Sequence, residues 1–462
     1  MRKLLKTIAL MLTSLSLTMS GLHYIKSRSP AGVRLWFPRL VASALSPFTA
    51  ITGAVGWLLG MMSDSPLAAL MGLVSASAST RHVQRVTRPH AEFERVFGAD
   101  WLERLSPERH LGLLKQRWSW QSWAQQALGR PVTVSPEPRW ERDVPYVTVP
   151  GTDRKLLCDV WQPPLGVAPS GLAFIYMHGS AWYLVDKDVG TRPMFRHLAL
   201  QGHVVMDVAY RLYPEARMAD MVGDVKRAVA WMKSNAVRFG VNPARIVLAG
   251  GSAGGHLALM AAYAPRHPDL TPLGLKDADL SVRAVAAFYG LADLRANFEY
   301  VIRGMPPMRI QHQDDLHPAS PHPVSMPWEN SMITRWMRYR WGGEFERLGF
   351  SKQLPANWFE DLVGANPVSG QADLLDRLTL FSPITHVHPG CPPTLLLQGD
   401  DDLLVPAEAT LRLRRKLQEA GVPVVCVIFP HTDHGFDLIL PRYSPSAQVS
   451  LYDLDCFLAL MV

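Results

Sequence analysis

The sequence predicts an α/β protein in which helices cover both faces of a mostly parallel, eight-stranded sheet. A helical and largely apolar N-terminal region precedes it. Two observations predict this arrangement. From about residue 144 onward, short apolar runs alternate with stretches of helical length. Such continuous apolar strands are typical of parallel sheets, which are buried on both faces. Before residue 80, in contrast, two long segments carry no formal charge.

The composition excludes several classes of protein. The chain has 462 residues, of which 48% are hydrophobic and 19% are charged. These values exclude a disordered tail, a collagen-like repeat and a strongly charged solvating domain. The cysteines form no C-x-x-C pair, which excludes a disulfide framework and a Cys-ligated zinc module. We expect buried thiols at Cys158, Cys391, Cys426 and Cys456.

Residues 1–80 are predicted to associate with a membrane. Residues 7–25 form an uncharged run of 19 residues, and residues 40–63 form a second run of 24. A helix that spans the hydrocarbon core of a bilayer needs about 20 apolar residues. A cleaved signal sequence is an alternative for the first run, and a buried helical cap is the alternative for the whole region.

The basic charge of the chain is concentrated around these runs. Residues 1–150 hold 18 Lys and Arg against 9 Asp and Glu, whereas the rest of the chain holds 29 against 31. An excess that flanks apolar segments suits anionic lipid headgroups better than nucleic acid. We therefore predict a membrane localisation, with membrane lipid as a partner and no nucleic acid. The side of the membrane stays open, because the loop between the runs and both outer flanks are basic. The cations of that loop are Lys26, Arg28, Arg34 and Arg39.

Residues 81–143 are predicted to form a helical cap and a linker. Leucine and tryptophan residues recur at spacings of 3 and 4 between residues 90 and 130, which indicates helix. We favour a cap packed over the following domain, and a tryptophan belt at a membrane interface is the alternative. The Pro-punctuated segment 130–138 is then a linker.

Residues 144–462 are predicted to be the α/β domain. The expected strands cover residues 144–149, 155–161, 172–177, 203–209, 245–249, 282–288, 394–398 and 424–429. The expected helices cover residues 191–201, 220–238, 253–264, 407–420 and 446–460. Ligands of such sheets bind beyond the carboxyl ends of the strands, so we expect the chemistry there.

The strand at 245–249 leads through a G-x-S-x-G motif into a helix. The motif consists of Gly250, Ser252 and Gly254 with their neighbours. A nucleophile elbow needs a serine on a strained turn, with small residues two positions before and after it. The N–H of Ala253, at the start of the helix, then points at a developing oxyanion. A glycine-rich strand–helix turn that binds a phosphate, or that binds no ligand, is the alternative.

Three further strand ends carry polar residues. Segment 178–182 follows the strand at 172–177, segment 399–406 follows that at 394–398, and segment 430–436 follows that at 424–429. Parallel strands end at the same edge of a sheet. The sequence therefore predicts that a serine, an aspartate and a histidine, in that chain order, meet at one rim.

Together these motifs resemble the α/β-hydrolases of the hormone-sensitive-lipase and carboxylesterase type. The resemblance covers about residues 145–460. It is carried by HGSAW at 178–182, YRLYPE at 210–215, GGSAGGH at 250–256, GDDDLLVP at 399–406 and HGF at 434–436.

The resemblance implies a role for each matching residue. It implies that Ser252 is the nucleophile, that His434 is the general base and that Asp402 orients His434. It also implies an oxyanion hole built from the N–H groups of Ser180, Ala181 and Ala253, with no cofactor and no metal. The chain departs from the family where Ser180 and Ala181 replace glycines. Their side chains leave the N–H donors intact but narrow the space beside them.

Neighbouring residues compete for two of these roles. Asp400 and Asp401 are alternatives to Asp402, which the D-x-x-V-P spacing favours. His431 is an alternative to His434, which the following Gly-Phe favours.

The segment from about 291 to 381 is predicted to be a lid-like insertion. It is rich in tryptophan and methionine, and a loop of this length inside a compact domain is usually a lid or a binding element. Its apolar content suits an acyl or prenyl group, and packing against the cap is the alternative. Histidines and aspartates between 312 and 322 have the chemistry of metal ligands, but a solvated, Pro-rich loop is the favoured interpretation.

The sequence therefore predicts a membrane-associated serine hydrolase that cleaves small-molecule or lipid carboxylic esters through an acyl-enzyme. An amidase or formamidase and a methylesterase for lipidated cysteine are alternatives on the same fold. A non-catalytic binding protein is the alternative from another class. The oligomeric state stays open.

Overall fold

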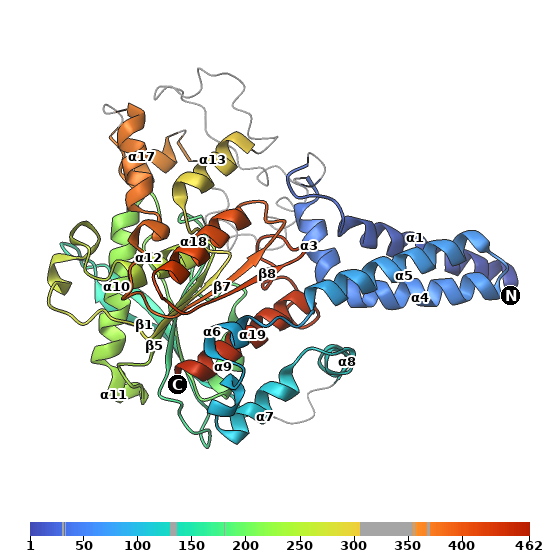
Figure 1. Ribbon diagram of the computed structural model, residues 1–462, viewed down its shortest axis with the longest axis horizontal. Coiled ribbons are helices and arrows are strands. Elements are labelled where there is room, and N and C mark those ends of the chain that lie inside the picture. Colours follow the sequence, from blue (N-terminus) through green and yellow to red (C-terminus); the bar gives the residue numbers. More distant parts are fainter. Residues whose placement is uncertain are drawn as a thin grey trace. The chain divides into compact units, whose positions relative to one another are not determined.

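In the computed structural model, which Figure 1 draws as a ribbon, the chain forms two compact units. The described residues are 1–29, 32, 34–129, 136–179, 181–304, 354–355, 357–366 and 370–462. The first unit comprises residues 1–134 together with 399–403 and 427–457. The second unit comprises residues 135–398, 404–426 and 458–462.

An eight-stranded sheet has the strand order β1-β2-β4-β3-β5-β6-β7-β8. Its strands are β1 (Arg139–Thr148), β2 (Lys155–Gln162), β3 (Ala173–Met177), β4 (Val204–Val208), β5 (Ile246–Gly251), β6 (Ala284–Phe288), β7 (Thr394–Gly399) and β8 (Val424–Phe429). β2 pairs antiparallel with β1 and β4, whereas the pairs from β4 through β7 are parallel. All eight predicted strands are present, and the sheet is mostly parallel, as predicted.

Helices connect the parallel strands by crossovers. α9 (Arg192–Leu200) joins β3 to β4, and α10 (Met218–Ser234) with α11 (Ala236–Phe239) joins β4 to β5. Because β4 and β5 flank β3 on opposite sides and such crossovers are right-handed, α9 and α10 cover opposite faces of the sheet. The chain reverses its direction across the sheet at β3, so the carboxyl ends of β3 and β5 border the crevice where ligands of such sheets bind.

The remaining helices of the predicted α/β region follow the later strands. They are α12 (Ala253–Tyr263), α13 (Leu294–Gly304), α16 (Trp358–Val363), α17 (Gly370–Leu380), α18 (Ala407–Glu419) and α19 (Pro445–Met461). Short 3-10 turns cover Pro268–Leu270, Leu273–Leu275 and Pro383–His386. The helices predicted from the sequence are present within a few residues of their expected bounds. Of the predicted insertion, α13, α16 and α17 are described, and the candidate metal ligands between 312 and 322 lie outside the described residues.

Three long helices of the first unit form a bundle: α1 (Arg2–Leu22), α4 (Ser46–Met62) and α5 (Pro66–Val86). Figure 1 shows them side by side. At one end of the bundle Arg2 contacts Asp64, with 3.3 Å between the guanidinium and the carboxylate. Within the described chain, α1 is long and apolar enough to cross a membrane, and α3 (Trp36–Ala44) with α4 adds a second candidate if this bent pair is one span.

The uncharged run at 40–63 does not form one straight helix, which corrects the expectation of a single long span. α3 and α4 meet at an angle of 73° around Leu45. Pro47 explains the break, because its nitrogen has no hydrogen to donate to the carbonyl of Ser43 and its ring clashes there. The run therefore covers only the second half of the short α3 and the whole of the 17-residue α4.

Residues 90–130 are helical, as predicted, but form several short helices. These are α6 (Glu92–Phe97), a 3-10 turn (Trp101–Arg104), α7 (Pro107–Gln116) and α8 (Trp120–Leu128). Gly98 ends α6 with a φ of 91°, and Pro107 begins α7. Trp123 is buried, and its indole N–H donates to the carbonyl of Tyr443 at 2.9 Å. This tryptophan therefore packs inside the first unit and does not face a membrane interface.

Candidate active site

Ser252 occupies a strained turn between β5 and α12. Its backbone has φ 53° and ψ −122°, in a region that is costly for a residue with a Cβ. The N–H of Ser252 donates to the carbonyl of Phe288 at 2.9 Å, and its own carbonyl accepts from the N–H of His256 at 2.9 Å. These bonds hold the turn between β6 and the first turn of α12. The conformation is the one that a nucleophile elbow needs.

The glycines on either side of Ser252 permit this close approach of strand and helix. A Cβ on Gly254 would lie 2.0 Å from the carbonyl oxygen of Met177, at the end of β3. A Cβ on Gly250 would lie 2.4 Å from the carbonyl carbon of Gly254. Both neighbours are backbone atoms, so any larger residue forces the strand and the helix apart.

The loop after β3 lies beside the elbow. A Cβ on Gly179 would lie 3.2 Å from the Cβ of Ser252. Ala181 and Trp182, further along this loop, have positive φ values of 50° and 65°. Ser180 lies outside the described residues. Of the N–H groups proposed for the oxyanion hole, that of Ala253 stands in the first turn of α12, where N–H groups have no intrahelical acceptor.

The YRLYPE segment supports this loop. The hydroxyl of Tyr210 donates to the carbonyl of His178 at 3.0 Å, and the two rings stack with 4.5 Å between centroids. The N–H of Tyr213 donates to the carbonyl of Trp182 at 2.9 Å. The YRLYPE segment therefore holds the backbone of the loop at both ends, because the carbonyls of His178 and Trp182 are the acceptors of these bonds.

An aromatic cluster packs against the same loop. The indole of Trp182 lies edge-on to the ring of His256, with 5.4 Å between centroids. Phe359 and Trp358, from the described part of the insertion, contact Trp182 and Tyr183 at 6.2 Å and 5.5 Å. The insertion thus contributes an apolar wall against the loop that follows β3.

His256 is a structural residue of this cluster. Its Nε2 lies 2.7 Å from the carbonyl oxygen of Phe381, and its side chain is fully buried. Burial lowers the pKa of His256 to about 4, so the ring is neutral at ordinary pH and donates to that carbonyl.

Asp402 and His434 form a buried pair in the first unit. Asp402 follows β7 and His434 follows β8. The Nδ1 of His434 lies 2.9 Å and 3.1 Å from the two carboxylate oxygens of Asp402. Burial by itself lowers the pKa of His434, but the charge and hydrogen bond of Asp402 outweigh it, so this pKa lies above its ordinary value. The carboxylate fixes the tautomer that leaves Nε2 as the basic nitrogen.

Asp401 and His431, which are alternatives for the acid and the base, have arginine partners. A carboxylate oxygen of Asp401 lies 2.6 Å from a guanidinium nitrogen of Arg39. The Nε2 of His431 lies 2.8 Å from a guanidinium nitrogen of Arg85, and its ring packs against Tyr24 at 5.8 Å between centroids. These contacts favour Asp402 and His434 over Asp401 and His431 for the acid–base pair.

Asp433 is a residue that the sequence analysis missed. One of its carboxylate oxygens accepts from the N–H of His434 at 2.7 Å and from the N–H of Leu403 at 2.9 Å. It therefore ties the turn that carries Asp402 to the turn that carries His434. Burial raises the pKa of Asp433 to about 6, although Arg39 opposes this shift. No sequence motif marks this role, because an aspartate before a histidine is common on any loop.

Arg39 was expected to face lipid headgroups, and it is buried instead, with 4% of its side chain exposed. Its guanidinium contacts Asp433 at 2.6 Å in addition to Asp401. Proximity to an uncharged run was its only sequence signal, and that signal is shared by the other basic residues of the loop.

Among the residues that the structure describes, no group of three or more His, Cys, Asp or Glu side chains is arranged to hold a metal ion. The described cysteines at 158, 391, 426 and 456 are buried and form no disulfide.

Two family models match the chain. The BD-FAE family matches residues 158–313, and the prolyl oligopeptidase family matches residues 358–452. The first range contains the turn of Ser252, and the second contains Asp402 and His434.

The chain is also similar to curated relatives. LipM, a probable carboxylic ester hydrolase of Mycobacterium tuberculosis (strain ATCC 25618 / H37Rv), is 29% identical over 283 residues, which are 61% of this chain and 53% of LipM. The esterase LipQ of the same organism is 27% identical over 410 residues, 83% of this chain and 80% of LipQ. The chain thus spans about half the length of LipM and four fifths of LipQ.

The chain is also similar to a solved structure. The propionate-bound esterase Est2 of Thermogutta terrifontis aligns with a TM-score of 0.46 and 23% sequence identity, covering 71% of this chain and 96% of Est2.

Proposed function

Because the chain is an α/β-hydrolase of the hormone-sensitive-lipase-like serine esterase type, we propose that it is a membrane-anchored hydrolase of carboxylic esters. The observation that carries the proposal is the buried hydrogen bond between Asp402 and His434, together with the strained backbone of Ser252. These features are the ones that nucleophilic catalysis by a serine needs.

In the proposed mechanism, Ser252 is the nucleophile. Its hydroxyl attacks the ester carbonyl, and Nε2 of His434 takes the hydroxyl proton. The imidazolium that forms is stabilised by Asp402, which stays ionised. His434 returns the proton to the leaving alcohol, and a water molecule, activated by the same imidazole, then cleaves the acyl-enzyme.

The tetrahedral intermediates need N–H donors for their negative oxygen. We assign this role to Ala253, Ala181 and Ser180. The first-turn position of Ala253 and the proximity of Gly179 to Ser252 support the assignment. Such a donor contributes about 10²–10³-fold in kcat in serine hydrolases.

The aromatic wall supports an apolar acyl group as the substrate class. Trp182, Trp358 and Phe359 line one side of the loop next to Ser252. An acyl chain gains about 0.8 kcal/mol for each CH₂ group that it buries. We therefore expect kcat/KM to rise with acyl length over the first few carbons.

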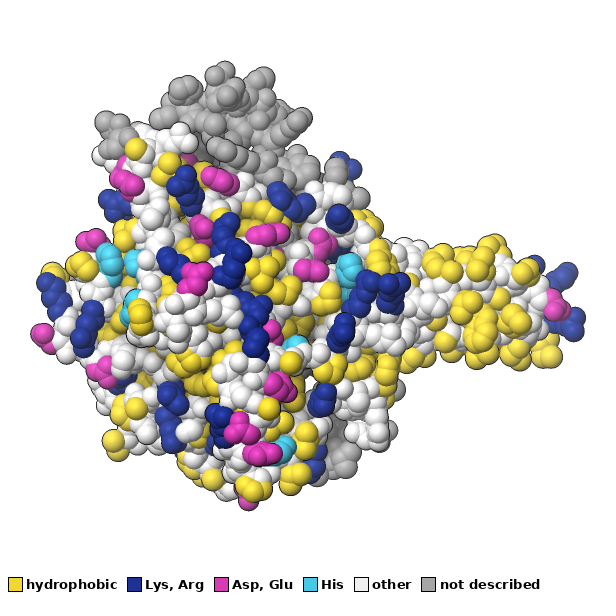
Figure 2. All heavy atoms as spheres, in the orientation of Figure 1, with side chains coloured by type: hydrophobic (Ala, Val, Ile, Leu, Met, Phe, Trp, Pro, Cys, Tyr) yellow, Lys and Arg dark blue, Asp and Glu magenta, His cyan; other side chains and the backbone are white. Residues whose placement is uncertain are grey.

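The N-terminal bundle supports membrane anchoring, because its polarity is the reverse of a soluble bundle. Its inward positions are small, and glycines bring the helices together: a Cβ on Gly60 would lie 2.5 Å from the backbone nitrogen of Ala69, and one on Gly72 would lie 2.4 Å from that of Trp57. Its exposed positions are large and apolar, as Figure 2 illustrates. They include Met11, Leu15, Ile51, Val55, Trp57, Leu58, Met61, Met62, Leu67, Leu70, Leu73 and Val74. Small interior residues and an apolar exterior are the pattern of helices that associate in lipid.

The hydroxyl groups of the bundle suit the same environment. Thr13 donates to the carbonyl of Ala9 at 2.8 Å, and Ser63 donates to that of Leu59 at 2.7 Å. These bonds lie within one helix and need no water. The 17 residues of α4 extend about 26 Å at 1.5 Å per residue, which approaches the hydrocarbon thickness of about 30 Å. The end of the bundle where Arg2 contacts Asp64 is charged, and we expect this end to lie at a headgroup layer of the bilayer.

Two measurements test the proposal separately. A panel of p-nitrophenyl esters of increasing acyl length, with a matched anilide, tests ester hydrolysis and its preference. Ser252→Ala should abolish both turnover and labelling by a fluorophosphonate probe while the protein keeps its melting temperature. Labelling that persists in this variant would assign the nucleophile to another residue.

The anchoring is tested with isolated membranes. The full chain should stay in the membrane pellet after washes with 1 M salt and with carbonate. Salt screens headgroup attraction beyond about 3 Å at such strength, so a basic surface patch alone would release the protein. Release by the salt wash would contradict insertion and leave the ester hydrolysis untouched.

A further inference from the structure

We propose that Arg39 is a positioning residue for the Asp402–His434 pair, and that the N-terminal region, to which Arg39 and the membrane-anchoring bundle both belong, thereby contributes to the active site. The inference rests on the proposed function, because it assigns Arg39 to a pair whose catalytic role is itself proposed. It adds a residue from outside the α/β region to that site.

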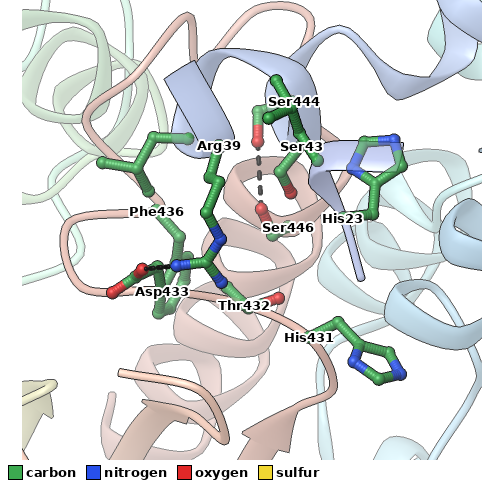
Figure 3. Close-up of a pocket in the computed structure, with 11 residues that line it drawn as sticks. His23, Arg39, Ser43, His431, Thr432, Asp433, Phe436, Ser444 and Ser446 are labelled. Atoms are coloured by element: carbon green, nitrogen blue, oxygen red, sulfur yellow. Dashed lines mark hydrogen bonds and ion pairs between the residues drawn. The ribbon is translucent and has the colours of Figure 1, made fainter. Parts of the chain in front are cut away.

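The guanidinium of Arg39 joins the two turns that carry the pair. One of its nitrogens lies 2.6 Å from a carboxylate oxygen of Asp401, the residue before Asp402. Its other terminal nitrogen lies 2.6 Å from a carboxylate oxygen of Asp433, the residue before His434. Figure 3 shows the guanidinium pointing at Asp433, with the dashed line that marks this ion pair.

The contact with Asp433 reaches His434 through the backbone. The oxygen of Asp433 that does not face Arg39 accepts from the N–H groups of His434 and Leu403. Arg39 therefore holds a carboxylate whose other oxygen fixes the backbone on both sides of the pair. Movement of this carboxylate changes the distance between Asp402 and His434.

Ser27 joins the same group of side chains, and we call Ser27, Arg39, Asp401 and Asp433 together the junction. Its hydroxyl lies 2.5 Å from the carboxylate of Asp433 and 2.5 Å from Arg39, and its N–H donates to the carboxylate of Asp401 at 3.0 Å. Ser27 and Arg39 belong to the loop after α1 and to α3, so both partners of the aspartates come from the N-terminal region.

The ends of the bundle helices fix the position of this junction. The rings of His23, after α1, and His82, in α5, stack with 4.3 Å between centroids. The neighbouring Arg85 contacts His431 at 2.8 Å, on the turn that also carries His434. A cavity of about 10 Å³ beside Arg39 and Asp433 has room for about one water molecule. The close packing leaves the guanidinium little freedom to move.

Burial makes the arrangement costly to disturb. Asp433 has 3% of its side chain exposed and Arg39 has 4%. Loss of one member of a buried ion pair leaves the other charge without compensation. Because the planar guanidinium bridges two carboxylates and an ammonium is a single point charge, lysine replaces its charge but not its bridge.

The test compares variants of the full chain in detergent micelles, with a short, soluble ester as substrate. Arg39→Gln should lower kcat about 100-fold and leave KM within about twofold, because a displacement of about 1 Å in the pair costs roughly this much while the acyl wall is unchanged. Arg39→Lys should recover part of the loss and remain about tenfold below wild type. The matched control is Arg81→Gln, on an exposed position of α5, with wild-type kcat.

A second variant covers the case in which Arg39→Gln does not fold. The double variant Arg39→Gln, Asp433→Asn removes both buried charges, while the amide oxygen of Asn still accepts from the two N–H groups. It should melt within a few degrees of wild type and still have a lowered kcat, because the guanidinium that bridges the side chains of residues 401 and 433 is absent, although the backbone contacts of residue 433 remain.

Several outcomes would overturn the inference. They are wild-type kcat in Arg39→Gln, full activity in Arg39→Lys, or wild-type kcat in the folded double variant. Ser252→Ala and His434→Ala are measured in the same assay. If these two stay active, the proposed function has failed. If they are inactive while the Arg39 variants turn over normally, only the role of Arg39 has failed.

Discussion

Three neighbouring aspartates have different environments, and the difference separates their roles. Asp402 has 2% of its surface exposed and faces His434. Asp401 is one quarter exposed and faces Arg39. Asp433 is buried and holds backbone N–H groups on both turns. A carboxylate of the same chemistry thus serves as a hydrogen-bond acceptor for the imidazole, as a counter-charge or as a backbone brace, according to what lies within 3 Å.

The first prediction separates the candidates for the acid. Asp402→Asn should lower kcat by about 10³–10⁴-fold. The amide favours the wrong tautomer of His434, and it carries no negative charge to stabilise the imidazolium that forms during the reaction. Asp400→Asn, in the same turn, is the matched control and should retain kcat within a few-fold. Steady-state kinetics on one soluble ester decide between them. A crippled Asp400→Asn with an active Asp402→Asn would reverse the assignment.

The pH dependence of kcat/KM gives a second prediction at the same scale. His434 acts as a base only when it is neutral, and Asp402 raises its pKa above the ordinary 6.5. Activity should therefore rise with pH through a midpoint above 6.5. Asp402→Asn removes the anion that favours the protonated ring, so the residual activity should show its midpoint at lower pH. A midpoint that does not move would mean that another group controls the profile.

At the scale of elements, the bundle depends on glycine more than on large side chains. α4 and α5 run antiparallel. Their contacts show this direction, since Gly53 lies next to Ala76 and Gly60 lies next to Ala69. The backbones approach so closely that no Cβ fits between them. In lipid, where apolar surface gains nothing by burial, such close packing is the main source of helix association.

The third prediction tests this packing. Gly60→Leu should lower the stability of the bundle by about 1–3 kcal/mol, since the side chain forces two backbones apart. The matched control is Gly21→Leu in α1, where an added Cβ meets nothing within 4 Å. Thermal melting of both variants in detergent, followed by far-UV circular dichroism, measures the difference. Equal melting temperatures would show that Gly60 is not a contact point.

At the scale of the whole molecule, the first unit combines distant parts of the chain. It contains the N-terminal residues and also the turns at 399–403 and 427–436. The candidate acid and base therefore belong to the same unit as the bundle. An anchor that was merely attached to an independent hydrolase would share no buried ion pair with the turns that carry them, whereas Arg39 pairs with Asp433.

The fourth prediction follows from this organisation. A chain that begins at Arg130 lacks Ser27 and Arg39, so Asp433 loses its counter-charge. We expect it to aggregate, or to fold and hydrolyse short esters with a kcat reduced by about 100-fold or more. Comparison with the full chain in the same detergent isolates the effect from membrane binding. A soluble truncated chain with full activity would show that residues 1–129 are only an anchor.

The sequence by itself determined the α/β class, the eight strands and the order of the motifs. Each of these depends on local information. A buried parallel strand such as β3 (AFIYM) is apolar along its length, and an elbow such as that of Ser252 needs glycine at fixed offsets. The uncharged runs of the N-terminal region are also local features, so the sequence shows them without any knowledge of tertiary contacts. The roles of Ser252, Asp402 and His434 stay predictions until the variants are measured.

Only the tertiary structure decided the bend at Leu45, the interruptions between 90 and 130, and the places of Arg39 and Asp433. Arg39 and Asp433 lie 394 positions apart in the sequence. Their pairing depends on how α3 packs against the turns after β7 and β8. A hydropathy profile records an arginine only as a charge, whether it faces a headgroup or two buried carboxylates. The physical reason is that a charge acquires its function from the groups within a few ångströms of it, and folding alone brings those groups together.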